Sequence, residues 1–563
     1  MSARAIANND MVYLQWTSAT KIPDCLGFTI HRVNLATHTE RPLSTWVGFE
    51  ATANVDRERR NSDVWPIQKF QWKDVTARRG GHYKYRIIPM LGTPAALTPA
   101  DDLAQETNEV SLAPTHGSIS VYFNRGIIST QAIANLLPKK PDGTPDEEAL
   151  RRLIQQPDGE VRERLAGDLD EALPSLLERA RKEGGECFCA LYELSDSQMI
   201  DALLQTERVH IILSNTGDDD ATNRDARQRL HAANKDIADR LLTSGHIGHN
   251  KFVVYVDAQG TPRSVLAGST NWTPTGLCSQ TNNLIIVDSE PLARQYLAYW
   301  HALRAEGAAQ SAAFRTSNRT QLPAVDLGAG EGSIQAWFSP NTVRFTKPSK
   351  DPATPVDLQE VFDLMASAEK GVLFLAFIPG RPSIVTELRR IYDEKVQQGQ
   401  RLFVRGAATD PGAAEEFKVE LFHRTMRSDA SVTSVAGIND PFSYWQRELY
   451  KLGHAVIHDK IVVIDPFTDN CTVITGSHNL GFKASYANDE NMLIIRGNRT
   501  IAEAYTAHVL DVYDHFRWRY RLQKASSSGH PDTAWQDLEE TDGWQDKYFD
   551  PQRLSSADTL FWG

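Results

Sequence analysis

The sequence has few cysteines and no long apolar run. The cysteines are scattered along the chain, at Cys25, Cys187, Cys189, Cys278 and Cys471. This pattern excludes a disulfide framework and favours a reducing compartment. No run of about 18 apolar residues occurs, and the first ten residues lack the apolar core of a signal peptide. The prediction is a cytoplasmic protein with no integral membrane segment, with export by a route that needs no cleaved signal left open.

The sequence also lacks an excess of basic charge. Its 60 Lys and Arg against 72 Asp and Glu give a formal net charge of -12, which argues against a protein that coats nucleic acid over its whole surface. A local basic cleft remains compatible with this total, because steering depends on the local field. The 563 residues are too many for one compact core, so two to four domains are expected.

Two stretches of the chain resemble each other. One runs His249-Asn250-Lys251 and later Gly268-Ser269-Thr270-Asn271, and the other runs His458-Asp459-Lys460 and later Gly476-Ser477-His478-Asn479. The two histidines are 209 residues apart and the two final asparagines 208, so the register of a duplication is kept to one residue. Strand and helix patterns alternate around both copies, which predicts two α/β domains with largely parallel sheets.

The region before the duplication predicts a small all-β sandwich. Apolar and polar residues alternate as in half-buried strands around Val12, Leu14, Trp16, Tyr83, Tyr85 and Ile87. The pattern resembles a fibronectin type III or immunoglobulin-like domain. A recognition module for a protein partner and a docking or spacer domain both fit it.

The predicted organisation has four parts. We expect the sandwich at residues 1–113, the first α/β half at 118–315, the second half at 333–522 and an extended tail with aromatic anchors at 523–563. The Gly-rich stretch Asp326–Ser333 is expected to be a flexible join. Among the helices, one is expected over 222–243, and another, with leucines spaced in fours from Leu165 to Leu177, should break at Pro174.

The repeated motif points to phosphate chemistry. Histidine and lysine at i and i+2 on a strand lie on one face, and the apolar run after Lys251 is typical of a buried strand. A buried lysine without an anionic partner is costly, and an anionic ligand would remove that cost. Two such halves face to face would hold one phosphodiester, with lysines and asparagines on its oxygens, one histidine attacking phosphorus and the other protonating the leaving oxygen. This chemistry needs no metal and no cofactor.

The motif pair resembles the signature of the phospholipase D superfamily. The second copy, His458-x-Lys460-x4-Asp465, fits closely, and in the first copy Asp257 lies one residue further from Lys251 than expected. The compact form is similar to bacterial nuclease-like and cardiolipin hydrolase-like members. The resemblance implies two α/β halves that share one active site and a metal-independent phosphohistidine mechanism.

An acidic residue downstream of the asparagine commonly orients the histidine in that family. The second copy has Glu490 there and the first has Asn282. We expect Glu490 beside His458, where it would favour the imidazolium form, and Asn282 beside His249. His249 is then the predicted nucleophile and His458 the general acid. The predicted catalytic residues are His249, Lys251, Asn271, His458, Lys460, Asn479 and Glu490, and the predicted substrate-binding residues are Ser269, Ser477, Asn282 and Trp272.

Other interpretations of these residues are weaker. The pairs His246/His249 and His454/His458 have zinc-like spacing, but both precede strands and no third ligand lies nearby. Asp218-Asp219-Asp220 fits a solvated helix cap better than a metal cluster. A scaffold without catalysis is disfavoured because both copies of the motif are intact.

The substrate class is less determined than the chemistry. The predictions favour a phosphodiesterase acting on nucleic acid, with a phospholipid as the alternative. Aromatic residues that could stack on bases or meet acyl chains are Trp272, Tyr444, Trp445 and Phe482. Candidates for a basic groove are Arg125, Lys347, Lys350, Arg424, Arg427 and Lys483.

Overall fold

The computed structural model describes most of the chain. The described residues are 1–50, 58–126, 138, 147–216, 220–243, 245–343, 353–409, 430–434, 457–527, 537–551 and 553–562. Several residues singled out from the sequence lie outside these ranges, namely Asp218, Asp219, Lys347, Lys350, Arg424, Arg427, Tyr444, Trp445 and His454.

The N-terminal region is all-β, as predicted. One sheet has the order β1 (Ser2–Ala7), β2 (Val12–Thr17), β7 (Gln71–Asp74). The other has the order β10 (Gln105–Glu106), β8 (His82–Thr93), β3 (Cys25–Asn34), β4 (Thr39–Pro42). Trp16, Phe28 and Tyr85 fill the core between them. The hydroxyl of Tyr83 accepts a hydrogen bond from the backbone of Arg78 (3.2 Å), the tyrosine corner found in sandwiches of this type.

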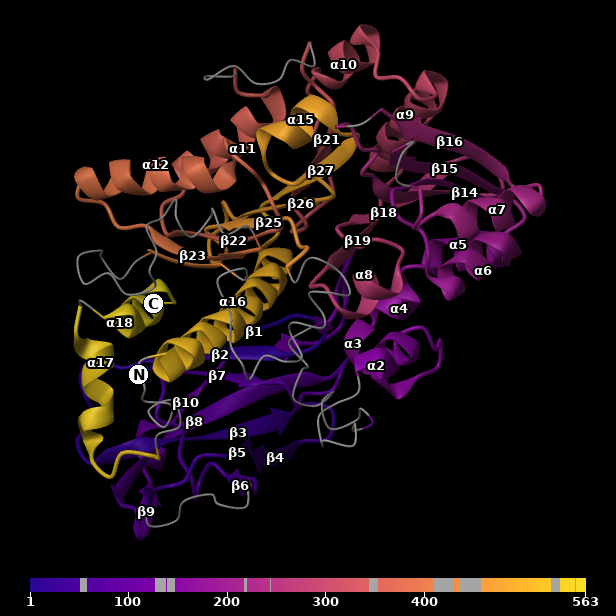
Figure 1. Cartoon of the computed structure of the whole chain (residues 1–563). Coiled ribbons are helices and arrows are strands. Elements are labelled where there is room, and N and C mark those ends of the chain that lie inside the picture. Colours follow the sequence, from indigo (N-terminus) through magenta and orange to yellow (C-terminus); the bar gives the residue numbers. More distant parts are fainter. Residues whose placement is uncertain are drawn as a thin grey trace.

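Two eight-stranded sheets follow, one in each copy of the duplication (Figure 1). The first has the order β12 (Thr115–His116), β13 (Ile119–Phe123), β19 (Asn283–Asp288), β18 (Pro262–Gly268), β17 (Lys251–Val256), β14 (Glu186–Leu191), β15 (Val209–Thr216), β16 (Asp236–Leu242). The second has the order β20 (Val325–Asp326), β21 (Ser333–Ser339), β27 (Glu490–Arg496), β26 (Thr472–Gly476), β25 (Ile461–Ile464), β22 (Gly371–Ala376), β23 (Phe403–Ala408), β24 (Ala430–Ser434). The identical order confirms two tandem α/β halves.

The prediction of largely parallel sheets is wrong. Among the described strands of these two sheets, only the pairs β14–β15, β15–β16, β22–β23 and β23–β24 are parallel. Parallel neighbours need a crossover, and α6 (Ser197–Gln205), α7 (Arg224–Ala232) and α12 (Ile384–Gln397) supply it for the first three of these pairs. The motif strands instead turn back through short hairpins, such as the one after Val256, so they are antiparallel to their neighbours.

Helices connect the halves to each other and to the sandwich. In Figure 1, α11 (Val356–Ser367) and α12 cover one face of the second sheet, and α16 (Arg499–Ser527) lies between that sheet and the sandwich. Lys73 of the sandwich donates to Asp511 of α16 (2.7 Å), and Tyr13 donates to Asp514 (3.1 Å). No helix in the described ranges combines the length and apolar character needed to cross a bilayer.

Two predicted helices are shorter than expected. Instead of one helix over 222–243, α7 ends at Ala232, Asn234 adopts a positive φ of 53°, and the chain continues as edge strand β16. The leucine-spaced helix is broken at Pro174, as predicted, and also at Gly167, whose φ of 63° favours glycine. It forms α3 (Glu160–Ala166), α4 (Leu169–Ala172) and α5 (Ser175–Glu183).

The join and the tail also differ from the predictions. Asp326–Ser333 forms the turn of the β20–β21 hairpin, and Glu331 in it accepts from the backbone amide (2.7 Å) and hydroxyl (2.6 Å) of Ser118. The described tail is helical rather than extended, with η5 (Asp542–Gln545), α17 (Asp546–Phe549) and α18 (Leu554–Phe561). Its aromatic residues do pack on the body. The indole of Trp544 donates to the Cys25 carbonyl inside the sandwich (2.8 Å), and Phe561 stacks on Phe403.

Candidate functional site

The two motif histidines meet at the interface between the halves. Their ring centroids are 6.3 Å apart and the ring planes 70° apart. His249 is 3% exposed and His458 4%. Each precedes a buried central strand, β17 or β25, so the predicted face-to-face arrangement of the two motifs is present.

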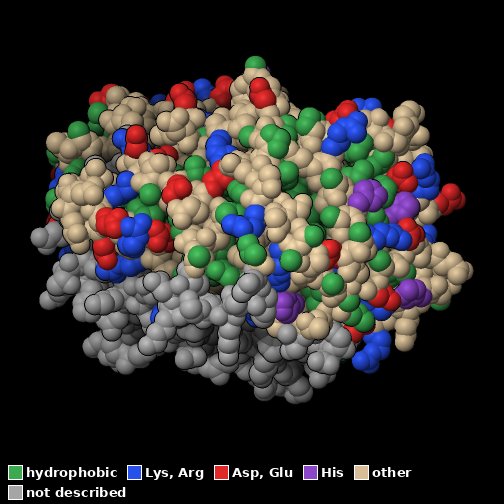
Figure 2. All heavy atoms as spheres, turned by 90° about the horizontal axis from the view of Figure 1, so that it is seen from above, with side chains coloured by type: hydrophobic (Ala, Val, Ile, Leu, Met, Phe, Trp, Pro, Cys, Tyr) green, Lys and Arg blue, Asp and Glu red, His purple; other side chains and the backbone are tan. Residues whose placement is uncertain are grey.

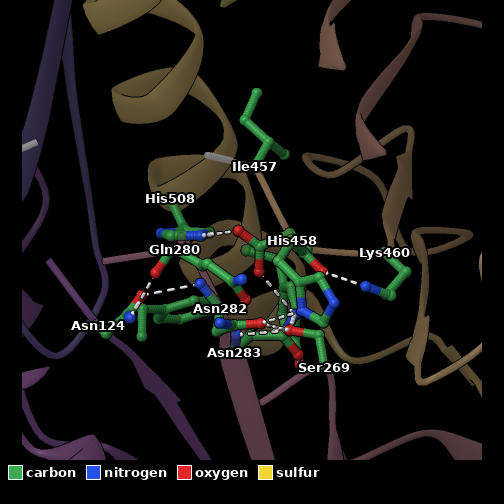
Figure 3. Close-up of polar contacts among 12 residues, drawn as sticks. Asn124, Ser269, Gln280, Asn282, Asn283, Ile457, His458, Lys460 and His508 are labelled. Carbon is green, nitrogen blue, oxygen red and sulfur yellow. Dashed lines mark hydrogen bonds and ion pairs between the residues drawn. The ribbon is translucent and has the colours of Figure 1, made fainter. Parts of the chain in front are cut away.

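The partner of each histidine comes from the other half, which corrects the expected pairing. Nδ1–H of His249 donates to Oε2 of Glu490 (2.8 Å), and Nδ1–H of His458 donates to Oδ1 of Asn282 (2.9 Å). Figure 3 shows Asn282 and Ser269 of the first half around His458. The sequence argument assumed partners within one copy, but each downstream segment runs beside the opposite histidine.

Backbone contacts explain this crossing. Asp489 N donates to the carbonyl of Ile247 (2.9 Å), and His458 N donates to the carbonyl of Thr281 (3.1 Å). The start of β27 is therefore held against the segment before His249, and the start of β19 against His458.

A second layer of side chains repeats the crossing. Asn491 donates to Asn250 (2.9 Å), and Asn283 donates to Asp459 (2.8 Å). Asp459 also contacts His508 of α16 (3.0 Å). Each half thus completes the environment of the other half's histidine, and neither half forms the observed site alone.

The serines and Asn282 support this framework. Ser269 donates to Oδ1 of Asn282 (2.8 Å), and Ser477 donates to Oε2 of Glu490 (2.9 Å). Asn282 in turn donates to the Gly276 carbonyl (2.8 Å). The serine protons and the Asn282 amide are therefore used within the protein, and these residues hold the histidine partners in place.

The predicted aromatic contacts lie elsewhere. Trp272 is 1% exposed and Phe482 5%, and both belong to the hydrophobic core. Their rings offer no surface for a base or an acyl chain. Among the described residues, the aromatic side chains beside the two histidines are Tyr192 and Phe377, whose ring centroids each lie 5.0 Å from that of the adjacent histidine.

The two lysines are buried. Lys251 donates to the carbonyl of His249 (2.7 Å) and Lys460 to that of His458 (2.5 Å). Each ammonium lies 5.1 Å from an aromatic ring centroid, Lys251 over Tyr192 and Lys460 over Phe377. Burial lowers the pKa of Lys251 to about 7 and that of Lys460 well below its ordinary value. An anionic ligand would stabilise both ammonium groups.

The two motif asparagines retain unused hydrogen-bonding capacity. Among the described residues, Oδ1 of Asn271 and Oδ1 of Asn479 are buried without a partner. Nδ2 of Asn271 donates to Oε2 of Glu193 (2.5 Å).

The sequence argument missed Tyr192, Glu193 and Phe377. The sequence could have indicated them only by their position, because they directly follow the strands β14 and β22, which pair with the motif strands.

The protonation states follow from burial and neighbouring charge. Burial lowers the pKa of His249 to about 4, although Glu490 opposes this shift. Burial lowers the pKa of His458 further, and the nearby lysines act in the same direction. Burial alone would raise the pKa of Glu490, but His249 and Lys251 hold it below its usual value. The ligand-free site thus holds neutral imidazoles and an ionised Glu490 near pH 7.

The two aspartates downstream of the motif lysines have local structural contacts. Asp465 accepts from the amides of Glu369, Lys370 and Gly371 (2.7, 2.8 and 2.8 Å) and so fixes the start of β22. Asp257 accepts from the Thr261 amide within its own hairpin turn (2.9 Å). The extra residue before Asp257 therefore leaves the site unaffected.

The remaining metal and basic candidates lie apart from the site contacts. His246 contacts Gln310 (2.8 Å), Arg125 pairs with Asp10, and Lys483 is exposed. Within the part of the chain that the structure describes, no group of three or more His, Cys, Asp or Glu side chains is placed to hold a metal.

Comparison with known proteins identifies the class. The family model described as "Cardiolipin synthase, PLD-like domain" matches residues 175–304 and 362–511. With the paired motifs and two sheets of identical order, this shows that the chain belongs to the phospholipase D superfamily. No curated protein matches the sequence closely enough to count as a relative.

Solved structures with a similar fold share little sequence. The phosphatidylserine synthase of Haemophilus influenzae Rd KW20 is 12% identical, with 66% of this chain and 93% of that chain covered and a TM-score of 0.40. Nuc of Salmonella typhimurium is 19% identical, with 33% of this chain and 96% of that chain covered and a TM-score of 0.19. Yeast tyrosyl-DNA phosphodiesterase is 11% identical, with 58% of this chain and 88% of that chain covered and a TM-score of 0.32. Likenesses at this level carry no argument about substrate.

Proposed function

We propose that the site cleaves a phosphodiester through a phosphohistidine on His249, with His458 as general acid and base. The contact between Glu490 and Nδ1 of His249 carries this assignment. A ring that donates its Nδ1–H to a carboxylate keeps the lone pair of Nε2 for attack on phosphorus.

The crossed partners fit the charge changes of the reaction. When Nε2 of His249 bonds to phosphorus, the ring gains positive charge, and Glu490 stabilises that charge. His458 loses positive charge when it gives its Nε2 proton to the leaving oxygen, and the neutral amide of Asn282 does not oppose that loss. The roles proposed from the sequence are kept, but for the opposite pairing.

The proposed reaction has two steps. First, Nε2 of His249 forms a bond to phosphorus, the bond to the leaving oxygen breaks, and that oxygen takes the proton of His458. Then Nε2 of His458 takes a proton from water, the water oxygen bonds to phosphorus, and the electron pair of the P–N bond returns to His249. The products are an alcohol and a phosphomonoester.

The remaining polar groups of the site would bind the phosphate oxygens. Lys251 and Lys460 supply positive charge, and Asn271 and Asn479 supply amide groups. In the ligand-free site both histidines are neutral near pH 7. When the pH falls, His249 takes up a proton before His458, because the pKa of His458 is lowered further. A bound phosphodiester raises the pKa of His458 by opposing the charge of the lysines, which enables its role as acid.

For the substrate we propose a nucleic-acid phosphodiester, with a phospholipid as the alternative and a non-catalytic scaffold as the third possibility. The preference rests on the two-motif chemistry and on the expectation of a protein without membrane segments. Trp272 and Phe482 are buried, so base stacking on these residues no longer supports the preference for nucleic acid. Among the described residues on the face seen in Figure 2, Lys/Arg and Asp/Glu side chains are interspersed, so these residues form no basic stripe that would support it either.

One set of assays separates the three. The full chain is incubated in EDTA with single- and double-stranded DNA, RNA, and phosphatidylcholine or cardiolipin vesicles, beside His249→Asn. Cleavage of nucleic acid that His249→Asn lacks supports the proposal. Cleavage of lipid alone contradicts the substrate, and binding without any cleavage supports the scaffold.

A further inference from the structure

Glu193 places a carboxylate beside a site that otherwise suits an anion. Its Oε2 accepts a hydrogen bond from Asn271 (2.5 Å), a residue proposed to bind a phosphate oxygen. We infer that Glu193 is a specificity-determining residue of the proposed phosphodiester site, which favours singly charged phosphodiesters over doubly charged phosphomonoesters. The inference rests on the proposed function.

The two halves differ in charge at this position although they match around it. In the first sheet Ala190 pairs with Phe252, the residue after Lys251. In the second sheet Leu375 pairs with Ile461, the residue after Lys460. This register makes Tyr192 equivalent to Phe377, and each ring lies 5.1 Å from its lysine. The next residue is Glu193 in the first half and Ile378, which is 49% exposed, in the second.

The charge of Glu193 reaches both lysines. It raises the pKa of Lys251 and that of Lys460, in each case against the larger effect of burial. Glu490 acts on both lysines in the same direction, and Asp459, which pairs with His508, acts on Lys460. Glu193 differs from these two carboxylates because it accepts a hydrogen bond from Asn271, one of the proposed ligands of the phosphate.

The position of Glu193 beside a proposed phosphate ligand separates substrate from product by charge. A phosphodiester carries one negative charge, whereas a phosphomonoester carries up to two above its second pKa of about 6. The second charge gains attraction from the lysines but meets repulsion from Glu193. Two unit charges a few ångströms apart near a protein surface repel by enough to change affinity roughly ten- to hundredfold. Glu193 thereby limits inhibition by the monoester product and promotes its release.

Two simple ligands test this discrimination. Dimethyl phosphate is a monoanion and methyl phosphate is a dianion at about pH 8, and their dissociation constants are measured by phosphorus NMR titration of the full chain. Any cost of protonating the lysines is common to both ligands and cancels in the ratio of the two constants. Glu193→Gln keeps an acceptor for Asn271 and removes the charge. It should shift the ratio about tenfold toward methyl phosphate.

Two further variants keep the test decisive. Ile378→Glu adds a charge at the equivalent position and should shift the ratio toward dimethyl phosphate. Glu171→Gln removes a charge from an exposed position on α4 and should leave the ratio of the two dissociation constants unchanged. An unchanged ratio in Glu193→Gln, with both ligands bound, overturns the inference and leaves the proposed function intact. Failure of the wild-type chain to bind either ligand contradicts the proposed function, and the inference falls with it.

Discussion

Glu490 of the second half accepts the Nδ1 proton of His249 of the first half across 2.8 Å. Both side chains are nearly inaccessible to solvent, at 0% and 3% exposure. The halves are thus connected through the residue pair on which the proposed chemistry depends. The equivalent contact on the other side, from His458 to Asn282, has the same geometry without the charge.

Removing the Glu490 charge should slow catalysis. Glu490→Gln leaves the developing charge on His249 unopposed and permits the wrong tautomer, so kcat should fall about 100-fold or more. On the acidic side of the pH profile the KM should change little, because the lysines are still charged there and bind the substrate. The measurement is steady-state kinetics with bis(p-nitrophenyl) phosphate. A variant with more than half the wild-type kcat would contradict the role of this carboxylate.

Adding a carboxylate beside His458 should affect the other proton transfer. Asn282→Asp would stabilise the protonated form of His458 and make it a weaker acid toward the leaving oxygen. We expect kcat to fall about tenfold for a diester with an alkyl leaving group and to change little for p-nitrophenol, which departs without a proton. Equal losses for the two leaving groups would show that His458 is not the acid.

The pH profile should have an acidic optimum. As pH falls through about 4, His249 becomes protonated and cannot attack, so kcat/KM should decrease. As pH rises through about 7, Lys251 loses its charge, and kcat/KM should decrease again. Because the pKa of His458 is lowered, rising pH also removes the proton that His458 must donate, and kcat/KM decreases further. Because Glu490 raises the pKa of Lys251, Glu490→Gln should move the basic limb to lower pH. A kcat/KM that increases above pH 7 would contradict these assignments.

The second layer of crossed contacts should stabilise the fold. Asn283→Ala removes the bond to Asp459 (2.8 Å) and the bond from Thr475 (2.8 Å) at a fully buried position. The free energy of unfolding should decrease by about 1–3 kcal/mol, since a buried carboxylate loses a donor. Urea denaturation measures this, with Asn470→Ala at an exposed position as control. Equal stability of the two variants would contradict a structural role for the crossing.

The sequence predicted those features that lie within one copy of the repeat. The spacing of His249 and Lys251, repeated at His458 and Lys460, predicted the duplication and the shared site. Local alternation predicted strands of the N-terminal sandwich, and Pro174 predicted a helix break. The prediction of strand direction was wrong because the strand pattern alone does not distinguish a hairpin from a crossover. The length of each connection has to be considered as well.

Relationships between the copies could not be predicted in the same way. Nothing within the second copy indicates that Glu490 faces His249, because that contact depends on how two sheets meet. The burial of Trp272 could not be predicted either, because whether its ring packs in the core depends on tertiary contacts. Glu193 lies far upstream of the motif in sequence, and only the pairing of Leu191 with Lys251 places it at the site.

The central claim, that His249 is the nucleophile, is tested most directly by trapping the intermediate. His458→Asn removes the base that activates water but spares a substrate whose leaving group needs no acid. With bis(p-nitrophenyl) phosphate, this variant should release about one equivalent of p-nitrophenol in a burst and retain the phosphoryl group that still carries the second p-nitrophenyl ester. Mass spectrometry of the quenched protein should then find the phosphoryl group on the peptide that contains His249. A burst with the group on any other residue, or turnover by the double variant that also carries His249→Asn, would contradict the account.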